Sequence, residues 1–118
     1  MRSLVTQWSA STGSSGASDW FQIANMSKLS ALIVTAGDNT AAGTVALEVS
    51  NESTTGGGSM MSFSPSTSAT VSGFTTTVTG NGTGLVAPFD VAYQWARFTW
   101  TRSAGSGGTV TVYLSGHD

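Results

Sequence analysis

The chain has 118 residues, which is enough for one domain with a single hydrophobic core. Only 8% of the residues are charged, against about 25% in an average protein, the net charge is −2, and there is no cysteine. These values exclude disulfides, thiolate metal sites and the clustered positive charge that nucleic acid or an anionic membrane surface attracts.

The polarity of the chain comes from small side chains instead of charges. Serine (19), threonine (18) and glycine (15) together make up 52 of the 118 residues. Short hydroxyl side chains compete with the helical backbone for hydrogen bonds, and glycine favours turns. The composition therefore predicts an all-β fold.

In chain order, the hydrophobic pattern predicts a first strand over residues 2–8, an irregular crossing over 19–28 and a central strand over 29–36 that is buried on both faces. The polar segments 9–18 and 51–59 are expected to be flexible loops or arms. Residues 44–50 alternate, so we expect their valines and leucine to point inward.

The second half of the chain continues the series of short strands. Strands are expected over residues 60–64 and 71–79. Residues 85–91 lead into the last part of the chain, and Pro88 limits residues 85–89 to an edge strand or an extended connection because proline donates no backbone hydrogen bond. No stretch approaches the roughly 20 apolar residues of a membrane-spanning helix. The N-terminal residues lack the apolar region of a secretory signal, so we expect no export.

The clearest pattern lies in residues 93–116. Two alternating runs of β-forming residues flank the Gly-Ser segment 104–108, which predicts a β-hairpin. In the first run Ala96, Phe98 and Trp100 share one face and are expected in the core. Seven or eight short strands at this spacing predict a single antiparallel β-sandwich, of jelly-roll type, that spans residues 1–118.

The residues offer little catalytic chemistry. His117, the one histidine, is next to last, where chain ends fray, so no base is expected beside a nucleophile. Asp38 lies in a Gly-Asp-Asn-Thr sequence that is typical of an Asx turn. The six carboxylates, Asp38 among them, show no pairing of the glycosidase or calcium type and are expected to solubilise the surface. We predict no catalytic residue, no cofactor and no metal site.

The aromatic residues are stronger candidates for a binding surface. Tyr93, Trp95 and Arg97 share the outer face of the first run in residues 93–116, and Trp20 is a further large aromatic residue. Tryptophan, tyrosine and arginine are enriched at protein interfaces, so these four residues are the candidate interface. Three interpretations of Trp95 stay open: packing in the core, contact with another subunit, and stacking on a ligand.

Two segments also resemble a known family. Residues 46–54 (ALEVSNEST) and 90–116 (DVAYQWARFTWTRSAGSGGTVTVYLSG) are similar to small virion proteins of tailed bacteriophages. Such proteins carry a strand that ends in a V-S-N-(D/E)-x-T turn and a later strand that ends in T-R-S-x-G-x-G-T. The resemblance implies a discoidin-like or jelly-roll sandwich that serves as a head decoration (cement) protein or as an adaptor or fibre-associated module.

The sequence and the resemblance together predict a structural protein without enzymatic activity. The expected role is capsid decoration, in which the chain is made in the host cytoplasm and binds the major capsid protein on the virion surface. A homo-oligomer, dimer or trimer, is expected because virion proteins act in symmetric assemblies. The alternative is a glycan-binding module of a tail fibre or baseplate, in which Trp95, Tyr93 or Trp20 stacks on sugar rings.

Overall fold

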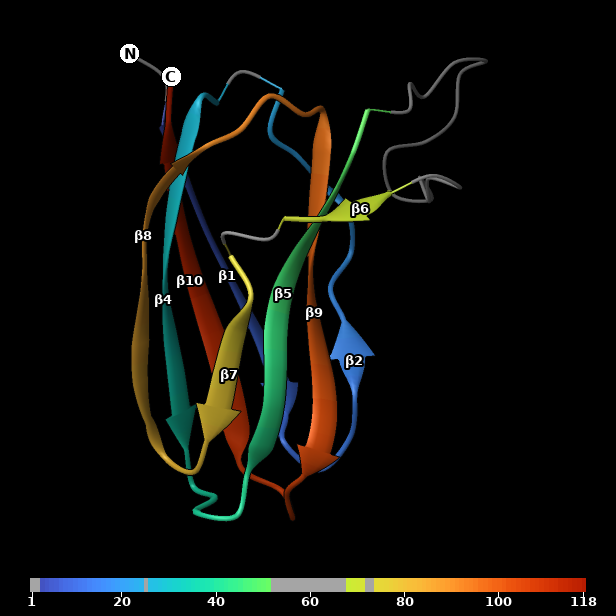
Figure 1. The fold of residues 1–118 in the computed structure, drawn as a ribbon, viewed down its shortest axis with the longest axis vertical. Helices are drawn as coiled ribbons and strands as arrows, with labels where there is room; N and C mark the ends of the chain where they lie inside the picture. The colour runs from blue at the N-terminus through green and yellow to red at the C-terminus, as the bar shows by residue number, and fades with distance from the viewer. Residues whose placement is uncertain (1–2, 25, 52–67, 72–73) are drawn as a thin grey trace.

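The computed structural model describes residues 3–24, 26–51, 68–71 and 74–118, and no helix occurs in this part of the chain. The strands are β1 (Ser3–Ser11), β2 (Gly16–Ala17), β3 (Phe21–Gln22), β4 (Lys28–Ala36), β5 (Ala42–Ser50), β6 (Ala69–Thr70), β7 (Thr76–Thr79), β8 (Gly82–Asp90), β9 (Trp95–Ala104) and β10 (Thr109–His117). Two antiparallel sheets pack face to face (Figure 1). The predicted all-β sandwich is confirmed.

Each sheet mixes strands from distant parts of the chain. Sheet A has the order β1-β10-β4-β8. Sheet B has the order β2-β9-β5-β6, with β3 also paired to β9 and β7 also paired to β5. β1 and β10 pair from Ser3↔His117 to Ser11↔Thr109, so the two ends of the chain lie together (Figure 1). β8 is an edge strand, which confirms the prediction that Pro88 keeps this segment at an edge or in an extended connection.

The core lies between the sheets, and β4, β5 and β10 contribute alternate residues to it. β5 alternates along its length, with its valines and leucine inward as predicted. The inward aromatic residues Phe98 and Trp100 of β9 are also buried, as expected from the sequence. The fully buried large side chains are Trp100, Phe74, Phe98, Ile23, Leu29, Ile33, Leu47, Leu114, Val45, Val49, Val110 and Val112.

The predicted hairpin over residues 93–116 is wrong. β9 belongs to sheet B and β10 to sheet A, so the Gly-Ser segment between them crosses from one sheet to the other (Figure 1). A sheet crossing needs the same flexible residues as a hairpin turn, and alternation within each strand is the same in both cases. Gly105 shows why glycine is required, since its φ is +146° and a Cβ there would meet the carbonyl of Thr12.

Other predicted elements need correction. Residues 9–18 do not form a separate arm. Residues 9–11 are the last part of β1 in sheet A, and β2 pairs with β9 in sheet B. β4 is central in sheet A as expected, but it is buried on one face only, because each sheet of a sandwich meets the core with one side. The loop predicted over 51–59, apart from Asn51, and the strand over 60–64 lie outside the described residues.

Candidate functional site

The residues predicted at an interface reach different environments. Trp95 is only 4% exposed, so the prediction that it is an accessible outward residue is wrong, and of its three interpretations packing within the domain is the one that fits. Trp95 pairs with Gln22 of β3 and Ser50 of β5 and shares the alternation of Arg97, so other parts of the protein cover it on that side of sheet B. Tyr93 is exposed in the connection between β8 and β9. These positions leave Tyr93 accessible to a partner and Trp95 covered.

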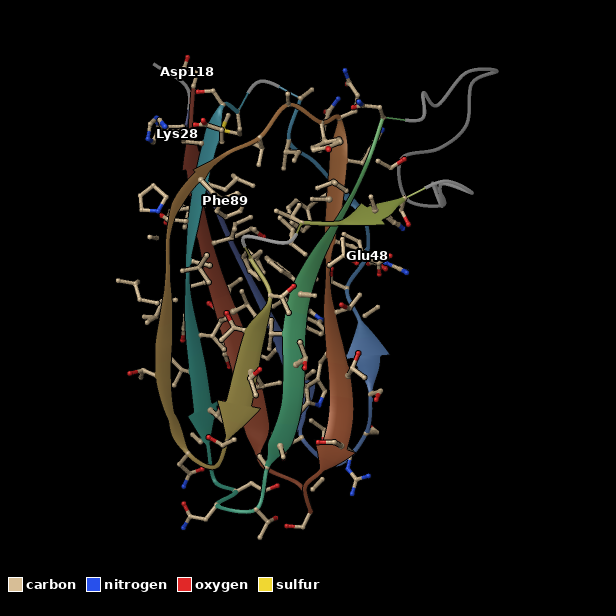
Figure 2. All side chains as sticks on the ribbon, viewed as in Figure 1. Lys28, Glu48, Phe89 and Asp118 are labelled. Carbon is tan, nitrogen blue, oxygen red and sulfur yellow. The ribbon has the colours of Figure 1, made fainter. Side chains whose placement is uncertain are left out.

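Arg97 and Trp20 do come together. The guanidinium carbon of Arg97 lies 5.0 Å from the centre of the Trp20 ring, a cation–π contact. Glu48 holds the same guanidinium from β5, with its Oε1 accepting from Nη2 at 3.1 Å and from Nε at 3.2 Å. Glu48 lies on the outer side of sheet B (Figure 2). The three side chains therefore form one partly buried cluster that fixes the indole of Trp20.

Trp20 also lines an aromatic groove beside β1. The groove encloses about 260 Å³, and its walls are Thr6, Gln7, Trp8, Ser18, Asp19, Trp20, Phe21 and Phe98. β1 forms one wall, and the segment that leads from β2 into β3 forms the other. Four of the eight lining residues are aromatic and none is basic. Half of its lining is therefore aromatic.

The outer face of sheet A carries a second candidate surface. Leu85, Leu32 and Tyr113 lie directly opposite one another on β8, β4 and β10, and we call these three residues the apolar row. Leu85 is 79% exposed, and Val5 on β1 is 81% exposed on the same face. The four strands place Lys28, Asp90 and His117 at one end of the sheet and carry no other charged or titratable residue besides Tyr113. The middle of this face is therefore uncharged, and the apolar row is flanked there by neutral polar residues such as Gln7, which lies opposite Tyr113.

The remaining ion pair lies away from the apolar row. Nζ of Lys28 lies 2.7 Å from Oδ1 of Asp90, and both side chains are well exposed. Lys28 sits at the end of the sandwich where the C-terminal Asp118 also lies (Figure 2). The hydrogen bond and charge of Lys28 lower the pKa of the Asp90 carboxyl.

Asp38 organises the opposite end of the sandwich. Its carboxylate accepts hydrogen bonds from the hydroxyls of Thr40 (2.6 Å) and Thr12 (2.7 Å) and from the backbone N–H groups of Ser106 (2.7 Å) and Gly107 (3.2 Å). These bonds hold the pKa of the Asp38 carboxyl far below its usual range, and the bond from the Thr40 hydroxyl has the largest effect. The predicted Asx turn is confirmed by the bond from the Thr40 N–H to Oδ1. The prediction that Asp38 solubilises the surface is wrong, because the residue is buried.

The described residues contain no cluster of three or more His, Asp or Glu side chains that suits a metal ion. Over the same ranges, no helix is long and apolar enough to cross a membrane. A further groove of about 220 Å³ lies between β7 and β8, and threonine and glycine make up most of its walls. This groove lacks aromatic and charged side chains, so it offers fewer contacts for a ligand than the aromatic groove does.

Comparison with known proteins adds no family. No protein-family model matches the chain, and no curated protein sequence matches it. One solved structure, described as the crystal structure of FLHE, aligns over 98% of both chains with 17% identity and a TM-score of 0.35. A similarity of that size carries no argument about function. The resemblance to phage virion proteins and the predicted dimer or trimer stay predictions.

The sequence did not predict most residues of the aromatic groove or of the apolar row. Trp8, Phe21 and Phe98 come from three separate strands, and only the fold brings them to one groove. The alternation in β10 did place Tyr113 on an outer face, as the structure confirms. Its alignment with Leu32 and Leu85 depends on strand order and register, for which the sequence holds no local signal.

Proposed function

We propose that the chain is a structural protein of a bacteriophage particle, without enzymatic activity, that decorates the capsid by docking the outer face of sheet A on the major capsid protein. The observation that carries the proposal is the uncharged face with its apolar row. The family resemblance of residues 46–54 and 90–116 supports the location on a virion.

The chemistry of this face suits a permanent contact. Exposed apolar side chains that lie side by side gain about 25 cal/mol for each Å² that a partner removes from water. A charge at the same place would lose its hydration on docking, and the middle of sheet A has none. Tyrosine is enriched and charged residues are depleted at the centres of interfaces, which is the composition found around Tyr113.

The test begins with the particle. Virions of the phage that encodes the chain are purified, and the chain is quantified against the major capsid protein by mass spectrometry. We expect a fixed ratio set by capsid symmetry, and cryo-electron microscopy is expected to show sheet A facing the shell. Absence of the chain from purified virions, or a location at the tail, overturns the proposal.

A pair of charge substitutions tests the surface itself. Leu85→Lys puts a charge into the exposed apolar row, whereas Thr101→Lys puts the same charge on an exposed position of β9 in sheet B. Both changes are at exposed sites, so neither is expected to disturb folding. We expect Leu85→Lys to weaken binding to capsids that lack the chain, and Thr101→Lys to leave binding unchanged. Equal binding by both variants contradicts docking through sheet A.

A further inference from the structure

The floor of the aromatic groove is held in place by the core. Phe98 is fully buried, and two groove rings pack against it: Trp8 in a stacked arrangement at 5.9 Å between centroids and 15° between planes, and Phe21 at 5.2 Å. Because Phe98 cannot move without disturbing the core, Trp8 and Phe21 are fixed as well. A ligand would meet rings that are already in position, so little conformational entropy is lost on binding.

The fourth ring is held from the outside. Arg97 lies against Trp20 and is itself fixed by Glu48. Arg97 does not line the groove, whereas Trp20 does, so a part of the indole other than the one under the guanidinium faces the groove. The groove thus presents two tryptophans, one from each wall, with amphipathic rings that suit a partly apolar, partly polar ligand.

A polar group with free hydrogen-bonding capacity stands beside these rings. Asp19 extends from the segment opposite β1 and is exposed, and its side chain bonds to none of the described parts of the chain. A carboxylate supplies acceptors for the hydroxyls of a ligand. Ser18 is already engaged, since its Oγ donates to the carbonyl of Asp19 and accepts from the N–H of Phe98. Gln7 points to the outer face of sheet A, opposite Tyr113, so Asp19 is the group that could orient a ligand.

The charges around the groove select among ligand classes. Its lining contains Asp19 and no lysine or arginine, which disfavours phosphate, sulfate and carboxylate groups. The aromatic rings would otherwise suit a quaternary ammonium group, but Trp20 already carries the Arg97 cation, which disfavours a second one. What fits is a neutral ligand with an apolar face and several hydroxyls.

From these contacts we infer that the aromatic groove binds a sugar ring of a neutral glycan. The C–H face of the ring lies on Trp8 or Trp20, and its hydroxyls bond to Asp19. The volume of about 260 Å³ is below the roughly 300–1,000 Å³ of sites for drug-sized ligands and suits one ring of a longer chain. This activity goes beyond capsid decoration, because the groove lies beside β1 and not on the apolar row.

The test uses the full chain on an array of neutral, acidic and sulfated glycans, followed by calorimetry with the best neutral oligosaccharide. Trp20→Ala is expected to weaken binding at least about tenfold, the loss of one stacking contact. Thr101→Ala changes an exposed side chain of β9 outside the groove and is the control, with unchanged affinity expected. Asp19→Asn, which keeps the shape but loses the charge, is expected to weaken binding less than Trp20→Ala.

A second measurement does not depend on the variants. In a titration of the ¹⁵N-labelled chain, a neutral oligosaccharide is expected to shift the indole N–H signals of Trp8 and Trp20 and to leave that of buried Trp100 in place. Absence of any neutral glycan ligand, a preference for acidic glycans or choline, or unchanged affinity in folded Trp20→Ala overturns the inference. Capsid binding by Trp20→Ala, measured in parallel, separates failure of this inference from failure of the decoration role.

Discussion

The hydroxyl of Thr12 donates a 2.7 Å hydrogen bond to the carboxylate of Asp38 and accepts one of the same length from the N–H of Gly108. This places one buried side chain between the turn after β4 and the segment that carries the chain from β9 to β10. The N–H of Thr12 also donates to the carbonyl of Gly108 at 3.1 Å. The sheet crossing is therefore held by residues far away in the sequence.

Replacement of Thr12 by valine is expected to destabilise the fold by about 1–3 kcal/mol. Valine has nearly the same shape, so the loss comes from the partly buried N–H of Gly108 and the carboxylate of Asp38, which both lose a partner. The free energy of unfolding in urea measures the effect. Thr101→Val at an exposed position is the control and is expected to stay within about 0.5 kcal/mol of the wild type. Similar losses in both variants would show that the hydroxyl of Thr12 has no special role.

The pH dependence of stability is expected to report on Asp38. Because its pKa in the folded chain lies below the ordinary value of 3.8, the carboxylate stabilises the fold above that value. The contribution falls progressively as the pH drops below about 4 towards the folded pKa. Asp38→Asn keeps the size of the side chain and removes the titration. Asp90 is present in both proteins, so its own lowered pKa cancels in the comparison.

Urea midpoints of wild type and Asp38→Asn between about pH 2 and pH 7 provide the measurement. We expect the wild type to be the more stable protein by a constant margin near neutral pH, and the margin to narrow below about pH 4. Two curves that run parallel down to the lowest pH would contradict the role of the Asp38 carboxylate.

The close contact between β5 and β9 gives a third prediction. A Cβ at Gly43 would meet the carbonyl of Thr101 and lie 2.7 Å from the ring of Trp100. Both neighbours are fixed, one as backbone and the other as a fully buried side chain, so Gly43→Ala is expected to cost about 1–3 kcal/mol through overpacking. Thermal unfolding measures the loss. At Gly16 a Cβ would meet nothing within 4 Å, so Gly16→Ala is the control and is expected to leave the melting temperature close to that of wild type.

Local alternation was enough to predict which faces of β5, β9 and β10 form the core. Val45, Phe98 and Val112 point inward, because the period of two is set by backbone geometry alone. The partner of each strand could not be predicted in this way. The Gly-Ser segment suits a hairpin and a sheet crossing equally well, and the crossing is fixed by Asp38 and Thr12, which precede it by more than 60 residues.

The positions of the candidate site residues depend even more strongly on how the strands are arranged in the fold. Trp95 alternates as an outward residue, but it is buried in the folded domain, which the local pattern does not reveal. The aromatic groove joins Trp8 to Phe98, which lie in different sheets and far apart in the sequence. The aromatic content of the sequence predicted a binding surface, but the position of that surface follows only from strand order and register.

The two ion pairs are expected to differ in strength. Arg97 and Glu48 are partly buried, with side chains 32% and 20% exposed, and Arg97 also contacts Trp20. A double-mutant cycle with Arg97→Ala and Glu48→Ala is therefore expected to give a coupling energy of about 1 kcal/mol, at the upper end for such pairs. Urea unfolding of the four proteins provides the measurement, and it is repeated at high salt. The fluorescence of Trp20 should change in Arg97→Ala, because the ring loses the guanidinium beside it.

The matched cycle uses Lys28→Ala and Asp90→Ala. This pair has a shorter separation, 2.7 Å, but its side chains are 49% and 85% exposed. Water and salt screen exposed charges, so we expect a smaller coupling that disappears at high ionic strength, while that of Arg97 and Glu48 persists. Equal coupling energies in the two cycles, or equal losses of coupling at high salt, would mean that Glu48 does not hold Arg97 against Trp20 in solution. The indole of Trp20 would then be less fixed than the contacts of Arg97 indicate.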